Sequence, residues 1–284
     1  MDRTLAQSGS TAGLARSRAA PSRPGGLYLV CWFLGSVLVA FLTVPLIALA
    51  LTQSGASLTG VVRLADVRDA IALSLEGAFL SAALAALVGV PLAYALARTA
   101  FPGKGIIAAL IDLPLAVPHT VAGIALLMVF GRQGVFGEPL QTMGLKFWGT
   151  AAGVVVAMLF VSAPYTVNAA RIGFEAVDTR LEKIARTLGL GPWSTFFRIT
   201  LPLARRSIMT GVTLTYARSI SEFGAVIILV YYPMTAPVKI YELFLRFGLE
   251  QSAAAAVLLL VVSLSLFILL RALGQRGGQP QEGR

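Results

Sequence analysis

The side chains that usually carry covalent or metal chemistry are scarce in this sequence. It contains one cysteine, Cys31, and one histidine, His119. A disulfide needs two thiols, and a zinc site usually needs three or four protein ligands. Cys31 lies in an apolar run, where an inert buried or lipid-facing thiol is expected. His119 has no partner ligands nearby in the sequence, so we interpret it as a hydrogen-bonding histidine and expect no metal site.

Two opposite charges, Arg218 and Glu222, fall inside an apolar segment at the i, i+4 spacing that places them on one helix face. Arg218 is about 18 Å along such a helix from Arg206, near the middle of a bilayer. Each charge there costs roughly 2.5–3.5 kcal/mol, so the pair should face the bundle interior or a water-filled path. Two interpretations stay open: a self-satisfied pair that fixes helix packing, or charges beside an anion route.

Another apolar segment is interrupted by Asp112, Pro114 and Pro118. Prolines four residues apart remove backbone donors and predict a bend, which membranes tolerate where protein or water covers the freed groups. The bend either borders a transport path or only shapes the bundle. The residues that we regard as candidates for a pathway or its gate are Asp112, Pro118, Thr120, Arg218, Ser221 and Glu222.

The amino-acid composition indicates which class of protein holds these residues in place. Of 284 residues, 57% are hydrophobic and 13% are charged, and the mean hydropathy is +0.80. A soluble domain carries about 25% charged residues, so an integral membrane protein is expected and a soluble enzyme is nearly excluded. The net charge of +10 does not indicate nucleic-acid binding, because the basic residues flank the apolar segments.

Six stretches are long and apolar enough for membrane helices, which need about 20 residues. Their approximate bounds are 27–51, 74–97, 106–130, 149–170, 207–230 and 253–270. We therefore expect an all-α membrane protein. In the second stretch, Gly77, Ser81, Ala85 and Gly89 are spaced by four, which favours close helix packing within one subunit. No internal repeat of the kind found in many secondary transporters is evident.

The basic residues also predict the orientation. If the N-terminus is cytoplasmic, 16 Lys and Arg residues lie in inside segments and six in outside loops, so both termini are expected in the cytoplasm. Residues 1–25 resemble a disordered cytoplasmic tail, with a transit peptide as the alternative. Residues 26–274 then form the transmembrane domain, and residues 275–284 form a second cytoplasmic tail.

One connection, residues 171–206, is too long for a plain loop. Its first half is amphipathic at helical spacing, with one apolar face, and Gly189 fits the left-handed position that ends a helix. A second helix begins at Gly191-Pro192 and is expected to end at Pro202. The apolar face of the first half consists of Phe174, Val177, Leu181, Ile184 and Leu188.

In the second helix, Trp193, Phe196 and Phe197 occupy positions i, i+3 and i+4. A helix this short is marginal by itself in water, so these aromatic side chains need burial. Physical reasoning leaves two partners open, the membrane interface and a groove on a cytoplasmic protein.

The loop resembles the motif of permease subunits of binding-protein-dependent ABC importers. That motif runs Glu-Ala-Ala, three residues, Gly, nine residues and Ile-x-Leu-Pro. Here Gly189 and Ile199-Thr200-Leu201-Pro202 match in full. The first three positions are Lys183, Ile184 and Ala185, so only the last alanine is retained, and the nearest acid, Glu182, stands one place early.

The resemblance extends over about residues 70–270. Segments 91–105, 112–131, 156–164, 180–189 and 217–242 are similar to molybdate/tungstate permeases, and sulfate permeases are close relatives. It implies a type I importer bundle of six helices per subunit, a homodimer, two cytoplasmic ATPase subunits and an extracytoplasmic oxyanion-binding protein. The residues that it assigns to the ATPase-coupling loop are Glu182, Ala185, Arg186, Gly189, Trp193, Phe196, Ile199, Leu201 and Pro202.

The sequence therefore favours the multi-pass inner-membrane subunit of an ATP-driven molybdate or tungstate importer, working by alternating access. It contains no GxxxxGK[ST] phosphate loop, so ATP and Mg²⁺ are expected on the partner ATPase and no cofactor in this chain. The first alternative is a sulfate/thiosulfate importer permease. The others are an ion-coupled secondary transporter and an intramembrane enzyme, which the docking loop and the scarcity of catalytic side chains disfavour.

Overall fold

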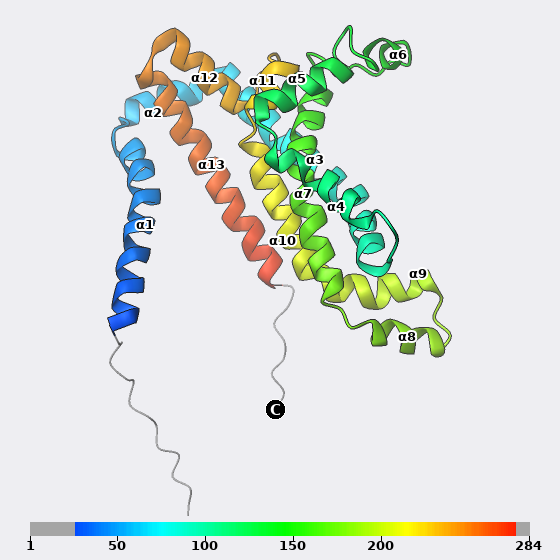
Figure 1. Cartoon of the computed structure of the whole chain (residues 1–284). Coiled ribbons are helices and arrows are strands. Elements are labelled where there is room, and N and C mark those ends of the chain that lie inside the picture. Colours follow the sequence, from blue (N-terminus) through cyan, green and yellow to red (C-terminus); the bar gives the residue numbers. More distant parts are fainter. Residues whose placement is uncertain (1–25, 277–284) are drawn as a thin grey trace, which may run out of the picture. The chain divides into compact units, whose positions relative to one another are not determined.

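The computed structural model describes residues 26–276, and every regular element in that range is a helix (Figure 1). The predicted tails, 1–25 and 275–284, lie outside the described residues, except Gln275 and Arg276, which continue the last helix. The described chain forms two units, which we describe separately. The first is α1 (Gly26–Leu51), a single apolar helix long enough to cross a membrane, and the second begins at Thr52.

The centre of the second unit is a three-helix bundle of α3 (Ala65–Arg98), α7 (Ala151–Glu175) and α10 (Leu201–Ile220). Small residues let these helices approach closely. A Cβ atom added at Gly77 would lie 3.2 Å from side-chain atoms of Met158 and Val154, and one at Gly89 would lie 2.9 Å from Val167. The predicted small-residue face of the second span therefore packs inside the subunit, as expected.

Hydroxyl groups also join these three helices. Ser81 of α3, Ser162 of α7 and Ser219 of α10 are fully buried, with Oγ atoms 2.8 to 3.4 Å apart. Nearby, the hydroxyls of Thr166 and Thr215 lie 2.6 Å apart. Each of these five hydroxyls thereby finds a partner, which avoids the cost of an unpaired polar group in an apolar interior.

Within residues 26–276, four helices are long and apolar enough to span a membrane: α1, α3, α7 and α13 (Leu249–Arg276). The predicted third span is broken into α4 (Lys104–Ala116) and α5 (His119–Phe130), which meet at a 112° bend and make a fifth span if counted together. Pro118 explains the break, because the residue before a proline avoids helical geometry and Val117 is extended. The predicted bend is therefore confirmed.

The predicted fifth span, 207–230, is not one helix. It consists of α10, a break at residues 221–223, and α11 (Gly224–Leu229). α10 carries Arg205, Arg206 and Arg218 and is too charged to count as a span by composition, yet it packs against α3, α7 and α13. Tertiary contacts therefore cover a helix that its own apolarity would not place in lipid.

Short helices connect the spans at the end of the bundle opposite the long loop (Figure 1). They are α2 (Gly55–Arg63), α6 (Gly137–Thr142) and α12 (Ala236–Phe247). On α12, Lys239 Nζ lies 2.6 Å from Asp66 Oδ2 and 2.5 Å from Glu242 Oε2. The hydrogen bond from Lys239, with help from Arg246, lowers the pKa of Glu242 despite partial burial.

Candidate functional site

The long loop contains α8 (Thr179–Thr187), which ends where the sequence predicts. Asp178 caps it by accepting a hydrogen bond from Arg180 N at 2.9 Å. At the other end Leu190 N donates to Ala185 O and Gly189 N donates to Arg186 O, the pattern of a Schellman motif. Gly189 has a φ of +89°, so its left-handed geometry is confirmed. Open space surrounds the position where its Cβ would be, so backbone conformation and not crowding calls for glycine.

The predicted apolar face of the loop is divided in two. Phe174 belongs to α7 and Val177 to the turn after it, and both are buried in the bundle. Leu181 and Ile184 on α8 are 44% and 57% exposed, and Leu188 directly after it is 79% exposed. The expectation of one continuous face was wrong, because α7 ends at Glu175 and α8 starts in a new direction after Asp178.

After Gly191 the chain is helical without a break through α9 (Pro192–Thr195), the π-helical turn η1 (Phe196–Thr200) and α10. The expectation that Pro202 ends this helix was wrong. Leu201 N donates to Phe196 O five residues back, and this wider turn accommodates Pro202, which has no backbone N–H to donate. The loop and the helix that carries Arg218 are therefore one continuous helical run.

The three loop aromatics do not share a face. Phe196 is half-buried, with ring centroids 4.7 Å from Tyr94 and 6.1 Å from Phe174. Trp193 and Phe197 are 76% and 56% exposed, and their rings stack with centroids 6.2 Å apart. Adjacent residues of a helix point about 100° apart, so Phe196 meets the bundle while Phe197 stays exposed, and the expected shared face was wrong.

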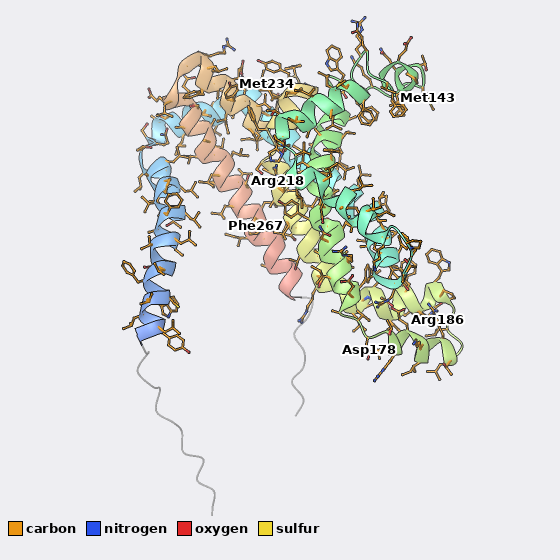
Figure 2. All side chains as sticks on the ribbon, in the orientation of Figure 1. Met143, Asp178, Arg186, Arg218, Met234 and Phe267 are labelled. Atoms are coloured by element: carbon orange, nitrogen blue, oxygen red, sulfur yellow. The ribbon has the colours of Figure 1, made fainter. Side chains whose placement is uncertain are left out.

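Charge around the exposed loop side chains is mainly positive. Arg180, Lys183, Arg186 and Arg198 are all exposed, and Figure 2 shows Arg186 at the same end as Asp178. Glu182, in contrast, is 6% exposed and points inward to Arg98. Among the other loop candidates, Ala185 is buried, Ile199 and Leu201 are half-buried, and Pro202 is exposed.

A second cluster surrounds Arg218, which lies partway along the bundle (Figure 2). Its Nη2 donates to Glu222 Oε2 at 2.8 Å, and its Nη1 donates to Ser221 Oγ at 3.3 Å. The same Nη2 lies 2.8 Å from Nε2 of His119, which faces it from α5. Since an arginine can only donate, this contact requires the unprotonated ring nitrogen of His119.

Glu222 is 1% exposed and also makes a contact with the backbone of α11. Its Oε1 accepts a hydrogen bond from Ala225 N at 2.8 Å, which caps the first turn of α11. This cap explains the break in the predicted fifth span. Close packing of α5 on α11 brings His119 to this point, because a Cβ at Gly224 would lie 2.7 Å from His119 Cβ.

Not all predicted pathway residues join this cluster. Asp112 accepts a hydrogen bond from Asn168 Nδ2 at 2.6 Å, which ties α4 to α7. Pro118 and Thr120 flank His119 and are exposed. Sequence reasoning missed the pairing of His119 with Arg218 and the role of Asn168. The polar Asn168 within the predicted fourth span was the available signal for the second of these.

The Arg218 cluster can attract an anion without holding it tightly. Arginine has five N–H donors, and the contacts above use three of them. Glu222 cancels its full charge, so a passing anion meets remaining hydrogen-bond donors and little net charge. In the described residues, 26–276, no group of three His, Cys, Asp or Glu side chains could hold a metal ion.

Residues 85–277 match the family model described as "Binding-protein-dependent transport system inner membrane component". The molybdate/tungstate transport system permease protein WtpB of Thermococcus kodakarensis is 45% identical over 240 residues, which cover 84% of this chain and 92% of that protein. The sulfate transport system permease protein CysW of Synechococcus elongatus is 34% identical over 218 residues, covering 75% and 76%.

A solved bacterial alginate ABC transporter, in complex with its periplasmic protein bound to an alginate pentasaccharide, has the same fold. Its chain gives a TM-score of 0.71 at 18% identity, covering 88% of this chain and 94% of that one. The fold and the apolar helices define a multi-pass membrane subunit of a transport system. The chain belongs to the family of inner-membrane components of binding-protein-dependent transport systems.

Proposed function

We propose that this chain is the membrane-spanning subunit of an ATP-driven importer of molybdate or tungstate, working by alternating access. Two copies pair with two cytoplasmic ABC ATPase subunits, which hold ATP and Mg²⁺, and an extracytoplasmic binding protein delivers the oxyanion. Both termini and the loop at residues 171–206 face the cytoplasm. The chain itself hydrolyses nothing. The similarity to the archaeal molybdate/tungstate permease supports this choice of anion.

The observation that carries the proposal is the exposed aromatic pair at the start of the helical run that leads to Arg218. Trp193 and Phe197 leave most of their surface uncovered, with Leu188 close by in sequence and a basic surround. Exposed aromatic side chains with arginines are typical of the core of a protein interface. An acidic, partly apolar groove on the ATPase fits this surface.

The Arg218 cluster fits the route of the anion. A dianion such as molybdate needs hydrogen-bond donors along its path, but a strongly charged fixed site would retain it. Arg218, offset by Glu222 and in contact with His119, supplies donors with little net charge. Selectivity then belongs mainly to the binding protein.

The test is transport in vesicles that contain this chain, its partner ATPase and its binding protein. We expect molybdate uptake that needs all three proteins and hydrolysable ATP, with tungstate competing at comparable concentrations. Uptake by vesicles that contain this chain alone would refute the proposal in favour of an ion-coupled secondary transporter.

Sulfate or thiosulfate import is the second candidate, because the cyanobacterial sulfate permease is also similar over most of both chains. The same vesicles distinguish the two. Sulfate in tenfold excess should leave molybdate uptake nearly unchanged if the first proposal holds. Strong inhibition by sulfate, together with sulfate uptake, would support the second.

A further inference from the structure

A buried ion pair lies where the long loop joins the bundle. Arg98 is the last residue of α3, and its Nε lies 2.8 Å from Oε1 of Glu182 on α8. The two side chains are only 13% and 7% exposed. A pair this well buried persists because each charge compensates the other, so removing one partner leaves a costly unpaired charge.

Two further groups complete the same contact. Thr200 Oγ1 donates to the same Glu182 Oε1 at 2.9 Å, and Arg98 Nη2 donates to Val177 O at 3.1 Å. Thr200 is the last residue of η1 and is fully buried. The contact therefore joins the end of α3, the turn before α8, α8 itself and the entry to α10.

An aromatic contact lies beside the ion pair. Tyr94 of α3 meets Phe174 of α7 and Phe196 of η1 edge-on, with centroids 5.3 and 4.7 Å away. Val177 belongs to the same apolar cluster. The loop is thus attached to the bundle by side chains on both of its helices, and not only by its two chain connections.

This geometry separates Glu182 from the exposed loop side chains. Its carboxylate is enclosed by groups of its own chain, whereas Trp193, Phe197 and Arg186 are open to a partner. We propose that Arg98, Glu182 and Thr200 are positioning residues that transmit movement of the docked loop to α3 and α10. This inference rests on the proposed function, since it assumes that an ATPase moves the loop.

The physical reason is stiffness. Without the ion pair, α8 could move under load while the end of α3 stayed in place, and ATP would be hydrolysed without opening the path. With it, displacement of α8 also displaces α3 and, through Thr200, the helix that carries Arg218. The pair should therefore affect the ratio of transport to hydrolysis more than it affects docking.

The first variant is Glu182→Gln, which keeps the size of the side chain and an acceptor for Thr200 but removes the charge. Its matched control is Glu175→Gln, which removes a carboxylate from a half-exposed pair with Arg171 at the end of α7. In the vesicles described above, we expect Glu182→Gln to keep the ATPase bound and hydrolysing while uptake per ATP falls about two- to thirtyfold. The control should match the unmodified chain.

The exchange Arg98→Glu with Glu182→Arg should recover part of the lost ratio, whereas each single exchange should not. If Glu182→Gln fails to assemble, Thr200→Val supplies the same test with a smaller change. An unchanged ratio of uptake to hydrolysis in the variant that assembles would overturn the inference. A lower melting temperature with an unchanged ratio would also overturn it, because the pair would then only stabilise the fold. Failure of the unmodified proteins to couple uptake to ATP would refute the proposed function instead.

Discussion

Removal of the Trp193 side chain is the sharpest test of the docking surface. Aromatic side chains bury 150–250 Å² each, and Trp193 is 76% exposed in this subunit. On the order of 150 Å² is therefore left for a partner to cover, or about 4 kcal/mol at 25 cal/mol per Å². The cost of ordering the interface lowers this to about 2–3 kcal/mol. Trp193→Ala should then weaken ATPase binding roughly 30- to 150-fold.

The assay is titration of the purified ATPase onto this chain in lipid nanodiscs, read as a dissociation constant. Trp148→Ala is the matched control, because Trp148 is also a part-exposed tryptophan, 40% exposed, but lies on the connection between α6 and α7 at the other end of the bundle. The control should bind normally. A change of less than threefold for Trp193→Ala would refute the docking role and favour burial of the loop aromatics in the membrane interface.

Three further predictions concern the turn, the charge cluster and the outer ion pairs. Gly189→Val forces a β-branched residue into left-handed geometry at a cost of about 1–2 kcal/mol, and should uncouple ATP hydrolysis from anion uptake. Gly191→Val is the control, because Gly191 has a φ of −67°, and it should leave the ratio of uptake to hydrolysis unchanged. Arg218→Gln with Glu222→Gln, which leaves no unpaired buried charge, should lower anion uptake about tenfold while ATPase binding persists; unchanged uptake would leave Arg218 a purely structural role. Because the pKa of Glu242 is lowered below its usual 4.5, its stabilisation is present above that pH and is lost as the pH falls through the lowered value. The melting temperature of the unmodified chain should exceed that of Glu242→Gln by about 2–4 °C at pH 6, and this difference should shrink as the pH falls below 4.5; a constant difference would contradict this.

Much of the fold could be predicted because local chemistry decides it. Long apolar runs must be helical in lipid, since no water is available for free backbone groups. Pro118 breaks its helix because it disfavours helical geometry at the preceding residue, Val117. Gly189 ends α8 through its own left-handed backbone conformation. The break at residues 221–223 could not be predicted in this way. It depends on Glu222 capping α11, and a glutamate inside an apolar segment does not reveal whether it pairs, caps or faces water.

The site was harder to predict because its contacts join residues far apart in sequence. Periodicity places Trp193, Phe196 and Phe197 on one face, but Phe196 packs against Tyr94, a partner about 100 residues earlier. From the sequence, Glu182 resembles an exposed acid of a loop, and only the fold shows that Arg98 lies beside it. In both cases helical spacing gives the neighbours along one helix, while the identity of the partner depends on how α3 packs against α7.

The continuous helix from α9 to α10 constrains how an ATPase could move the transport path. Trp193 and Arg218 are 25 residues apart on one helical run, which is about 37 Å of chain at 1.5 Å per residue. A rigid rod of that length would turn a small tilt at the loop into a large shift at Arg218, but η1 and Pro202 make a bend possible near the loop. Movement applied to α9 alone would then be absorbed at η1. The contacts of Phe196 and Thr200 with α3 and α8 lie at this weak point, so the load is shared with α3 where the helix by itself would bend.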